Sequence, residues 1–312
     1  MAAPTLPNPT SVFVLPSGRT LGYAQYGTPS ASAPTAFYHH GFPGSQSEAL
    51  GWDAAARAAG VRLISVERPG MGASTFQVGR TLLDWPADLL ALADHLQVPR
   101  FTVLGVSGGG PYALASHHRL PRARCAGAAL VCALYPTTAL GCGGMLWTTW
   151  ALLTLCPRAP TLCGFALDYV LGGVARDLAR PERLETAVAE GLQSRTAQDR
   201  SVLERRDARA ALVASTRGAM VSGGLGAAWD GLVLGGEFGF RLEDVRADDA
   251  RGGRVVMWHG GLDQNVPAHM AERAAARMAG AELRLSPECA HLDLPYKKAD
   301  EVMQCVKEML QS

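Results

Sequence analysis

The sequence has no excess of charge of either sign and few charged residues overall. Lys and Arg number 29, Asp and Glu number 28, and charged residues make up 18% of the 312 residues. Nucleic acids and anionic membranes attract proteins through clustered cations, so this balance argues against both as partners. The 35 glycines and 19 prolines follow no repeat, which excludes a collagen-like or low-complexity chain.

The seven cysteines lack the spacing of a metal site or of a disulfide framework. Their number is odd, no Cys-x-x-Cys pair occurs, and most lie in apolar stretches, a pattern typical of buried, reduced thiols. We expect no bound metal. Residues 1–10 lack the basic and apolar regions of a signal peptide, and the last residues carry no lipidation motif. These absences predict a cytoplasmic protein.

One segment has no charge at all: residues 125–157 contain no Asp, Glu, Lys or Arg. A membrane-spanning helix needs about 20 mostly apolar residues without interruption. Here Pro136 and the Gly-rich stretch 141–144 interrupt the run. We therefore expect a buried strand followed by an apolar helix near 145–156, and no transmembrane span.

Short apolar runs rich in β-branched residues alternate with helical patterns toward both ends of the sequence. This alternation is typical of parallel βα units. A hairpin is expected at 11–15 and 20–26, with further strands at 35–39, 62–66, 101–106, 127–134, 254–258 and 282–285. The expected helices lie at 47–59, 85–96, 109–118, 268–278 and 299–310. The predicted fold class is α/β, with a mostly parallel eight-stranded sheet flanked by helices.

Residues 136–253 show almost no strand pattern and several helical ones. No low-complexity linker sets this segment apart. It is expected to form a helical cap (lid) domain inserted into a core domain made of residues 1–135 and 254–312. The cap is rich in Leu, Ala and Trp, and Trp147 and Trp150 should pack within it, line its seam with the core, or line a substrate tunnel.

The strand expected at 101–106 leads into Gly105-Val106-Ser107-Gly108-Gly109, a G-x-S-x-G pattern set between a strand and a helix. Small residues on both sides allow a tight turn that presents the Ser107 hydroxyl above the sheet. An ordinary turn or a phosphate loop is the alternative, but the sequence lacks the P-loop lysine and a G-x-G-x-x-G pattern there. Ser107 is therefore the candidate nucleophile.

A serine hydroxyl needs a base that removes its proton and an acid that orients the base. At such an elbow the chain order is serine, acid, histidine. Asp263 lies in the loop after strand 254–258, where sites on parallel sheets collect, and no Asp or Glu follows the preceding strand at Leu134. Beyond Asp263, His269 falls inside a helix, whereas His291 follows the last strand in a loop. Asp263 and His291 are the candidate acid and base.

The segment His40-Gly41-Phe42-Pro43-Gly44 follows the strand expected at 35–39. Acyl transfer places negative charge on the substrate's carbonyl oxygen, and each preorganised N–H donor stabilises that charge by about 3–4 kcal/mol. The backbone N–H groups of Phe42 and Gly108 are the expected oxyanion hole.

Together these segments resemble the α/β-hydrolase superfamily, over nearly the whole chain outside the insertion. His40-Gly41-Phe42-Pro43-Gly44 and Glu67-Arg68-Pro69-Gly70-Met71-Gly72-Ala73-Ser74 look like the subgroup of esterases, epoxide hydrolases and haloalkane dehalogenases. Epoxide hydrolases and dehalogenases of that subgroup use an Asp at the elbow, so Ser107 argues against their activities. The resemblance implies an α/β-hydrolase fold with a cap and no cofactor. Cys289-Ala290 departs from the glycine that many relatives carry before the histidine.

The resemblance implies a serine hydrolase, a carboxylic ester hydrolase first of all, that cleaves an ester, thioester or lactone through an acyl-enzyme on Ser107. The apolar cap predicts an apolar small-molecule substrate. The alternatives are a C–C hydrolase, a lyase, cyclase or acyl transferase with the same triad, or a non-catalytic small-molecule receptor, which an intact triad disfavours. We expect a monomer or a homodimer.

Overall fold

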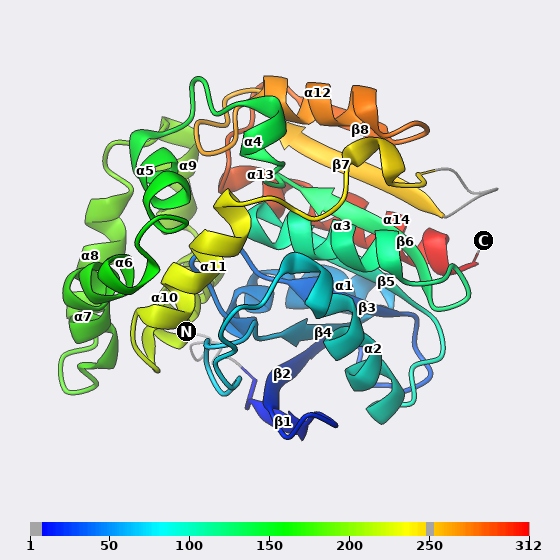
Figure 1. Cartoon of the computed structure of the whole chain (residues 1–312), viewed down its shortest axis with the longest axis horizontal. Coiled ribbons are helices and arrows are strands. Elements are labelled where there is room, and N and C mark those ends of the chain that lie inside the picture. Colours follow the sequence, from blue (N-terminus) through cyan, green and yellow to red (C-terminus); the bar gives the residue numbers. More distant parts are fainter. Residues whose placement is uncertain (1–7, 248–252, 312) are drawn as a thin grey trace.

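The computed structural model describes residues 8–247 and 253–311, and the eight strands found there form one sheet (Figure 1). The strands are β1 (Ser11–Val14), β2 (Thr20–Gly27), β3 (Thr35–His39), β4 (Arg62–Val66), β5 (Phe101–Val106), β6 (Cys125–Val131), β7 (Arg254–Gly260) and β8 (Glu282–Ser286). Their order is β1-β2-β4-β3-β5-β6-β7-β8. The pairs β1–β2 and β2–β4 are antiparallel, and the other pairs are parallel. The mostly parallel, eight-stranded sheet predicted from the sequence is confirmed.

The strand β6 ends earlier than predicted, at Val131 rather than at residue 134. Cys132 has a φ of +45°, in the left-handed region that an extended strand does not use. The N–H of Leu134 then donates to the carbonyl of Ser107 at 2.9 Å instead of joining the sheet. The early end of β6 therefore ties the following chain to the turn at Ser107.

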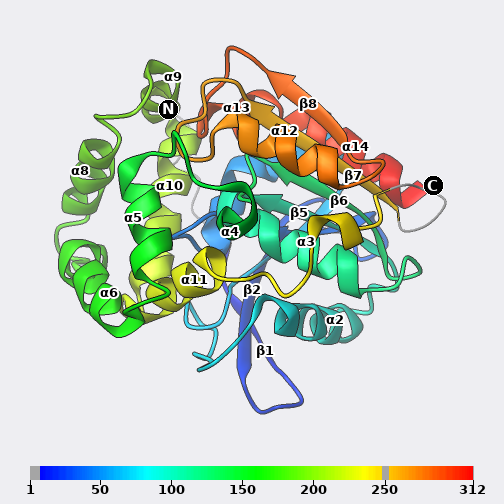
Figure 2. The same ribbon diagram turned by 45° about the horizontal axis from the view of Figure 1, so that its top comes forward.

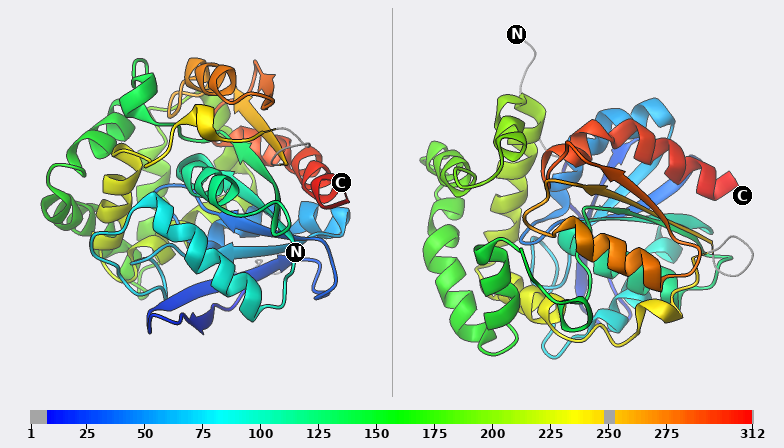
Figure 3. Two further views of the ribbon diagram at one scale, coloured as in Figure 1. Left: turned by 45° about the vertical axis from the view of Figure 1, so that its right-hand side comes forward. Right: turned by 90° about the horizontal axis from the view of Figure 1, so that it is seen from above.

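Helices cover both faces of the sheet, because successive residues of a strand point to opposite sides. They are α1 (Asp53–Ala59), α2 (Trp85–His95), α3 (Gly110–Arg119), α12 (Ala268–Arg277) and α14 (Ala299–Gln311), with the short η2 (Leu82–Asp84), η3 (Ser107–Gly109) and α13 (Asp293–Lys297). Along β5, Val103 packs in the hydrophobic cluster under α2, α3 and α12, whereas Leu104 packs in the cluster under α1 and α14. Figure 3 shows α12 (orange) and α14 (red) on opposite sides of the sheet.

The helix expected at 47–59 is divided in two. Its first part is a 3₁₀ helix, η1 (Gln46–Trp52), and its second part is α1. The carbonyl of Ser45 accepts the N–H of Glu48 at 3.1 Å, the short-range bond of this tighter helix. The turn brings the Glu48 carboxylate to the N–H of Gly41 at 3.0 Å, so η1 supports the loop after β3.

Between β6 and β7 the described residues form helices and connecting loops but no strand, and all of these helices except η6 (Leu242–Asp244), which contacts α12, lie beside the carboxyl ends of the parallel strands (Figures 1 and 2). We call them the cap helices. They are α4 (Thr137–Leu140), α5 (Trp147–Leu155), α6 (Pro160–Leu167), the π-helical η4 (Asp168–Gly172), α7 (Gly173–Arg176), α8 (Glu182–Gly191), α9 (Ala197–Ser201), η5 (Val202–Glu204), α10 (Arg206–Met220), α11 (Leu225–Gly235) and η6 (Leu242–Asp244). Five residues of the segment predicted as a cap, 248–252, lie outside the described residues.

The tryptophans of α5 do not lie where the sequence suggested. Trp147 is 71% exposed and Trp150 is 46% exposed, so neither is buried in a seam, a tunnel or the cap interior. The reason is that α5 is apolar around most of its circumference, and only the face that carries Leu153 is buried. Over residues 8–247 and 253–311, no helix combines the length and the apolar character needed to cross a membrane.

Candidate active site

The turn after β5 places Ser107 at the carboxyl edge of the sheet. Ser107 has a φ of +51°, a left-handed conformation that is uncommon for a residue with a side chain. Glycine is needed on both sides for steric reasons: a Cβ on Gly105 would lie 2.6 Å from the Gly109 carbonyl oxygen, and a Cβ on Gly109 would overlap the His39 carbonyl. The G-x-S-x-G pattern is thus the sequence that allows this turn beside β3.

The three candidate catalytic side chains lie in one hydrogen-bonded row. His291 Nε2 is 2.9 Å from Ser107 Oγ, and His291 Nδ1 is 2.7 Å from Asp263 Oδ2. A neutral imidazole with its proton on Nδ1 donates to the Asp263 carboxylate and leaves Nε2 free to accept the Ser107 hydroxyl proton. His291 and Asp263 are both buried. Residues from three separate loops of the sequence therefore meet in the arrangement that a nucleophile, a base and an acid require.

The surroundings of Asp263 keep its carboxylate ionised. Burial opposes ionisation, but His291, His259 and the backbone N–H of Val266 outweigh it and hold the pKa of Asp263 below its usual value. Its Oδ1 accepts the N–H groups of Asn265 and Val266, each at 2.8 Å. The second oxygen is left to His291. Burial lowers the pKa of His259, which disfavours the charged form of that ring.

The structure also brings the two expected oxyanion donors together. A Cβ on Gly108 would lie 2.5 Å from the Cβ of Phe42 and 3.3 Å from its backbone nitrogen, so the two residues are in close contact. Both line a cavity that also contains Ser107. Their backbones therefore lie close to each other beside Ser107, the placement that an oxyanion hole needs.

A buried arginine, which the sequence analysis did not single out, holds the loop that carries Phe42. Arg68 has no exposed surface, and its guanidinium donates to the backbone carbonyls of His40 and Gly41. It also binds the Asp230 carboxylate, with Nη2 at 2.7 Å from Oδ2. Arg68 belongs to the segment Glu67–Ser74, one of the segments that carried the family resemblance. The sequence did not indicate which groups the Arg68 side chain would contact.

Asp230 joins the cap helices to the core. It lies on α11 with a fully buried side chain and accepts hydrogen bonds from Arg68, from Arg80 Nη2 at 3.1 Å and from the Tyr112 hydroxyl at 2.6 Å. Burial opposes its ionisation, but the two guanidinium groups outweigh it and hold the pKa of Asp230 below its usual value. A lone Asp in an apolar helix carries no motif, so the sequence gave no sign of this role.

Ser107 lies where two cavities meet. The larger has a volume of about 280 Å³ and is lined by core residues such as Trp52 and Tyr296 and by cap residues such as Leu171 and Leu192. The smaller, of about 100 Å³, is lined by α5 residues including Leu152. The two share five lining residues: Phe42, Pro43, Ser107, Arg195 and Asn265. A substrate attacked by Ser107 can therefore extend to either side of the reacting carbon.

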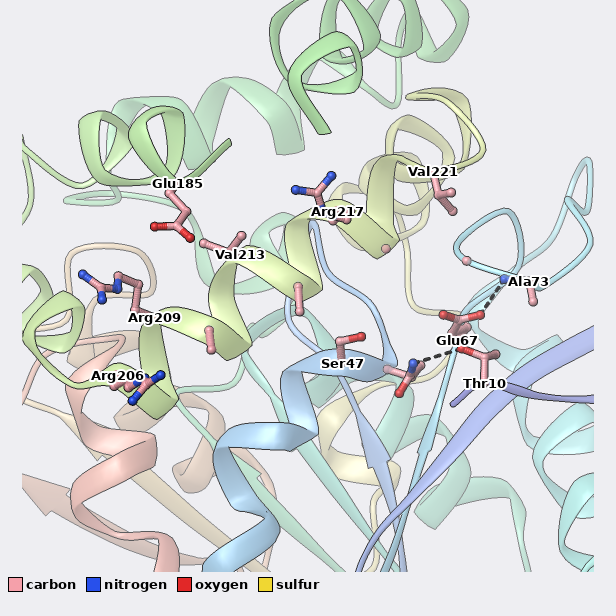
Figure 4. Close-up of a pocket in the computed structure, with 15 residues that line it drawn as sticks. Thr10, Ser47, Glu67, Ala73, Glu185, Arg206, Arg209, Val213, Arg217 and Val221 are labelled. Carbon is pink, nitrogen blue, oxygen red and sulfur yellow. Dashed lines mark hydrogen bonds between the residues drawn. The ribbon is translucent and has the colours of Figure 1, made fainter. Parts of the chain in front are cut away.

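A separate groove of about 880 Å³ lies between α10 and the core. Figure 4 shows Arg209, Val213 and Arg217 along one wall and Glu67 across from them. Burial raises the pKa of Glu67 to about 7, against the hydrogen bond it accepts from the Ala73 N–H. None of the three candidate catalytic residues lines this groove.

Three potential metal-ligand atoms lie close to one another at the site. The Cys132 thiol and the ligand atoms of Asp263 and His291 all lie within 4.8 Å of each other. A metal would need the Cys132 thiolate, and burial raises the pKa of that thiol well above its usual value. It would also compete with the hydrogen bond between Asp263 and His291. These residues therefore fit a proton-transfer site better than a metal site.

Comparisons with known proteins agree on one family and one fold. A family model described as the alpha/beta hydrolase family matches residues 37–304. The solved esterase RhEst1 from Rhodococcus sp. ECU1013 is 17% identical with a TM-score of 0.67, over 96% of this chain and 99% of that one. The enol-lactonase from Burkholderia xenovorans LB400 is 17% identical with a TM-score of 0.64, over 97% of this chain and 100% of that one. No curated protein matches the sequence significantly.

Proposed function

Because the chain belongs to the alpha/beta hydrolase family, we propose that it is a serine hydrolase that cleaves a carboxylic ester, thioester or lactone through an acyl-enzyme on Ser107. The observation that carries this proposal is the row of hydrogen bonds from Asp263 through His291 to Ser107. This geometry suits acyl transfer because it joins a nucleophile to a base and fixes the orientation of that base.

The proposed reaction begins when Ser107 Oγ attacks the carbonyl carbon while His291 Nε2 takes the hydroxyl proton. The carbonyl oxygen becomes negative and accepts hydrogen bonds from the N–H groups of Phe42 and Gly108. The intermediate then collapses: the C–O bond to the alcohol breaks, and His291 gives its proton to the leaving oxygen. Water, deprotonated by His291, attacks the acyl-enzyme; the bond from the acyl carbon to Ser107 Oγ breaks, His291 returns the proton to Oγ, and the acid is released. Asp263 remains ionised and stabilises the imidazolium.

We propose that residues 136–253 act as a cap domain on a core made of residues 1–135 and 254–312. The cap helices and the core both supply apolar side chains to the two cavities at Ser107, and the core supplies the candidate reacting groups. The apolar walls favour a small-molecule substrate with an apolar part. No cofactor takes part in these steps.

The test is covalent labelling with a fluorophosphonate, followed by mass spectrometry of the labelled peptide. We expect one adduct, on Ser107, and loss of both labelling and ester turnover in Ser107→Ala. Ser32→Ala, which changes an exposed serine in a turn outside the site, is the matched control and should behave as the wild type. Full turnover in Ser107→Ala, or an adduct on another residue, would contradict the proposal. Tight ligand binding without turnover of any ester would favour the receptor alternative.

A further inference from the structure

Arg195 lies beside the candidate nucleophile, in the turn between α8 and α9. It lines both cavities that meet at Ser107. Among the residues that line these two cavities, all of them within the described ranges, Arg195 is the one Lys or Arg. Its side chain is 17% exposed, so most of the guanidinium is removed from bulk water.

The protein satisfies only part of the hydrogen-bonding capacity of Arg195. Nη1 donates to the side-chain oxygen of Asn265 at 2.7 Å. Nε is buried and has no hydrogen-bond partner among residues 8–247 and 253–311. A buried donor without a partner costs free energy, and such donors are rare in folded proteins. The guanidinium therefore keeps unused donor capacity beside the two cavities that Arg195 lines.

The charge of Arg195 is also incompletely compensated. Its hydrogen-bond partner Asn265 is neutral, and the carboxylate of Asp199 is 3.9 Å away, beyond hydrogen-bonding distance. That carboxylate accepts the N–H of Leu292 at 2.7 Å, and burial raises its pKa. Arg195 therefore brings a positive charge with an unused donor to a cavity with one carboxyl group in its lining, that of Glu48, which already accepts hydrogen bonds from the Tyr38 hydroxyl and the Gly41 N–H.

We propose that Arg195 binds a carboxylate of the substrate, so that the substrate is an acidic ester with its carboxylate close to the scissile bond. This inference rests on the proposed hydrolase function and narrows its substrate class. A guanidinium and a carboxylate form strong, charge-assisted hydrogen bonds, above all where water is excluded. The apolar walls then hold the remainder of the substrate, and the carboxylate fixes which carbonyl meets Ser107.

A purely structural role for Arg195 makes a different prediction. Asn265 follows Asp263 by two residues and donates its backbone N–H to that carboxylate. If Arg195 only held this loop, its loss would slow all esters equally. If it binds the substrate's carboxylate, its loss will slow acidic esters selectively, mainly through KM.

The experiment compares matched acidic and neutral esters. One pair places the carboxylate on the acyl side: 4-nitrophenyl hydrogen succinate against 4-nitrophenyl butanoate. The other places it on the alcohol side: acetoxyacetate against ethyl acetate. The enzymes are the wild type, Arg195→Met, Arg195→Lys, and the control Arg209→Met, which removes an exposed arginine of α10 that lines the separate groove (Figure 4).

We expect the wild type to prefer the acidic ester in at least one pair. Arg195→Met should lower that preference roughly 10- to 100-fold, the range for a hydrogen bond to a charged group. Arg195→Lys should keep part of the preference for the acidic ester, and Arg209→Met should keep all of it. No acid preference in either pair, or an equal loss for acidic and neutral esters, would overturn the inference.

Calorimetry separates this inference from the proposed function. In the Ser107→Ala background, 4-nitrophenyl hydrogen succinate should bind more tightly than 4-nitrophenyl butanoate, and Arg195→Met should remove the difference. This binding needs no turnover. Failure of the fluorophosphonate to label Ser107 would defeat the hydrolase proposal alone, whereas equal binding of both esters would defeat the role of Arg195 alone.

Discussion

The buried carboxylate of Asp230 is the clearest place to test how the cap helices support the site. Asp230→Asn keeps the shape of the side chain but removes its charge. The carboxylate neutralises Arg68 and Arg80, whose side chains are 0% and 2% exposed. In the variant, two guanidinium groups stay buried without a negative partner, and the new amide N–H₂ faces other donors.

The size of the expected loss of stability follows from the burial of these charged side chains. Removing one partner of a buried ion pair costs about 3–5 kcal/mol, because the remaining charge is left uncompensated. Asp230→Asn should therefore lower the free energy of unfolding by about that amount. Arg68, released from Asp230, should also hold the carbonyls of His40 and Gly41 less firmly. The Phe42 N–H would then be less well placed, so kcat should fall, by at most the 10²- to 10³-fold typical of losing one oxyanion donor.

Urea denaturation followed by circular dichroism, together with ester kinetics, measures both effects. The matched control is Asp168→Asn, which breaks an ion pair with Arg176 on the surface of the cap, where the partners are 37% and 38% exposed. Exposed pairs contribute about 0–1 kcal/mol, so this variant should resemble the wild type in stability and in kcat.

The pH dependence provides a second check on the Asp230 argument. Its folded pKa lies below the unfolded value, which is about 3.9. The stabilisation is therefore present above the unfolded pKa and is lost as the pH falls through the folded pKa. The stability gap between wild type and Asp230→Asn should be constant near neutrality and shrink below about pH 4. If Asp230→Asn were as stable at pH 7 as Asp168→Asn, the argument that the buried Asp230 carboxylate stabilises the fold would be refuted.

Three further predictions concern the reaction and the thiols. Asp263→Asn should keep the fold, by circular dichroism, but lower kcat about 10⁴-fold, because the imidazole loses its orienting carboxylate; near-normal turnover would remove Asp263 from the triad. Gly108→Ala should reduce kcat far more than stability, since its Cβ would lie 2.5 Å from Phe42 Cβ; unchanged steady-state kinetics would show that the oxyanion hole lies elsewhere. A thiol reagent should modify the half-buried Cys142 and Cys163 before the five buried cysteines, and mass spectrometry of the native protein checks this order.

The sequence predicted the positions of the candidate triad because they depend on strand order and on short-range spacing. Ser107, Asp263 and His291 each follow a parallel strand, and the carboxyl ends of parallel strands share one edge of the sheet. The structure brings the three side chains into hydrogen-bonding contact. Their catalytic roles remain predictions until the variants are measured.

Other features depend on contacts between distant residues, and no local pattern announces them. Asp230 lies 162 residues after Arg68, and Arg195 lies 70 residues before Asn265. Asp230 is a single charged residue in a helix, and Arg195 is one in a turn. Charged residues in such places are usually exposed, so the sequence offered no reason to expect their burial. The exposure of Trp147 is a similar case, because an apolar helix does not reveal which of its faces will be buried.

If the cap that we propose opens to admit substrate, the contacts of the cap helices predict which part of it moves. Opening at α11 would separate Asp230 from two buried guanidinium groups. The free-energy cost would be about 3–5 kcal/mol, the cost of removing one partner of a buried ion pair. Opening at the turn between α8 and α9 would break the hydrogen bonds from Arg195 to Asn265 and from the Leu292 N–H to Asp199, and water could hydrate the Arg195 and Asp199 side chains. Opening at the turn between α8 and α9 therefore costs less free energy, since water replaces the hydrogen bonds that are broken. Substrate should therefore enter past Arg195, while α11 keeps the oxyanion loop fixed.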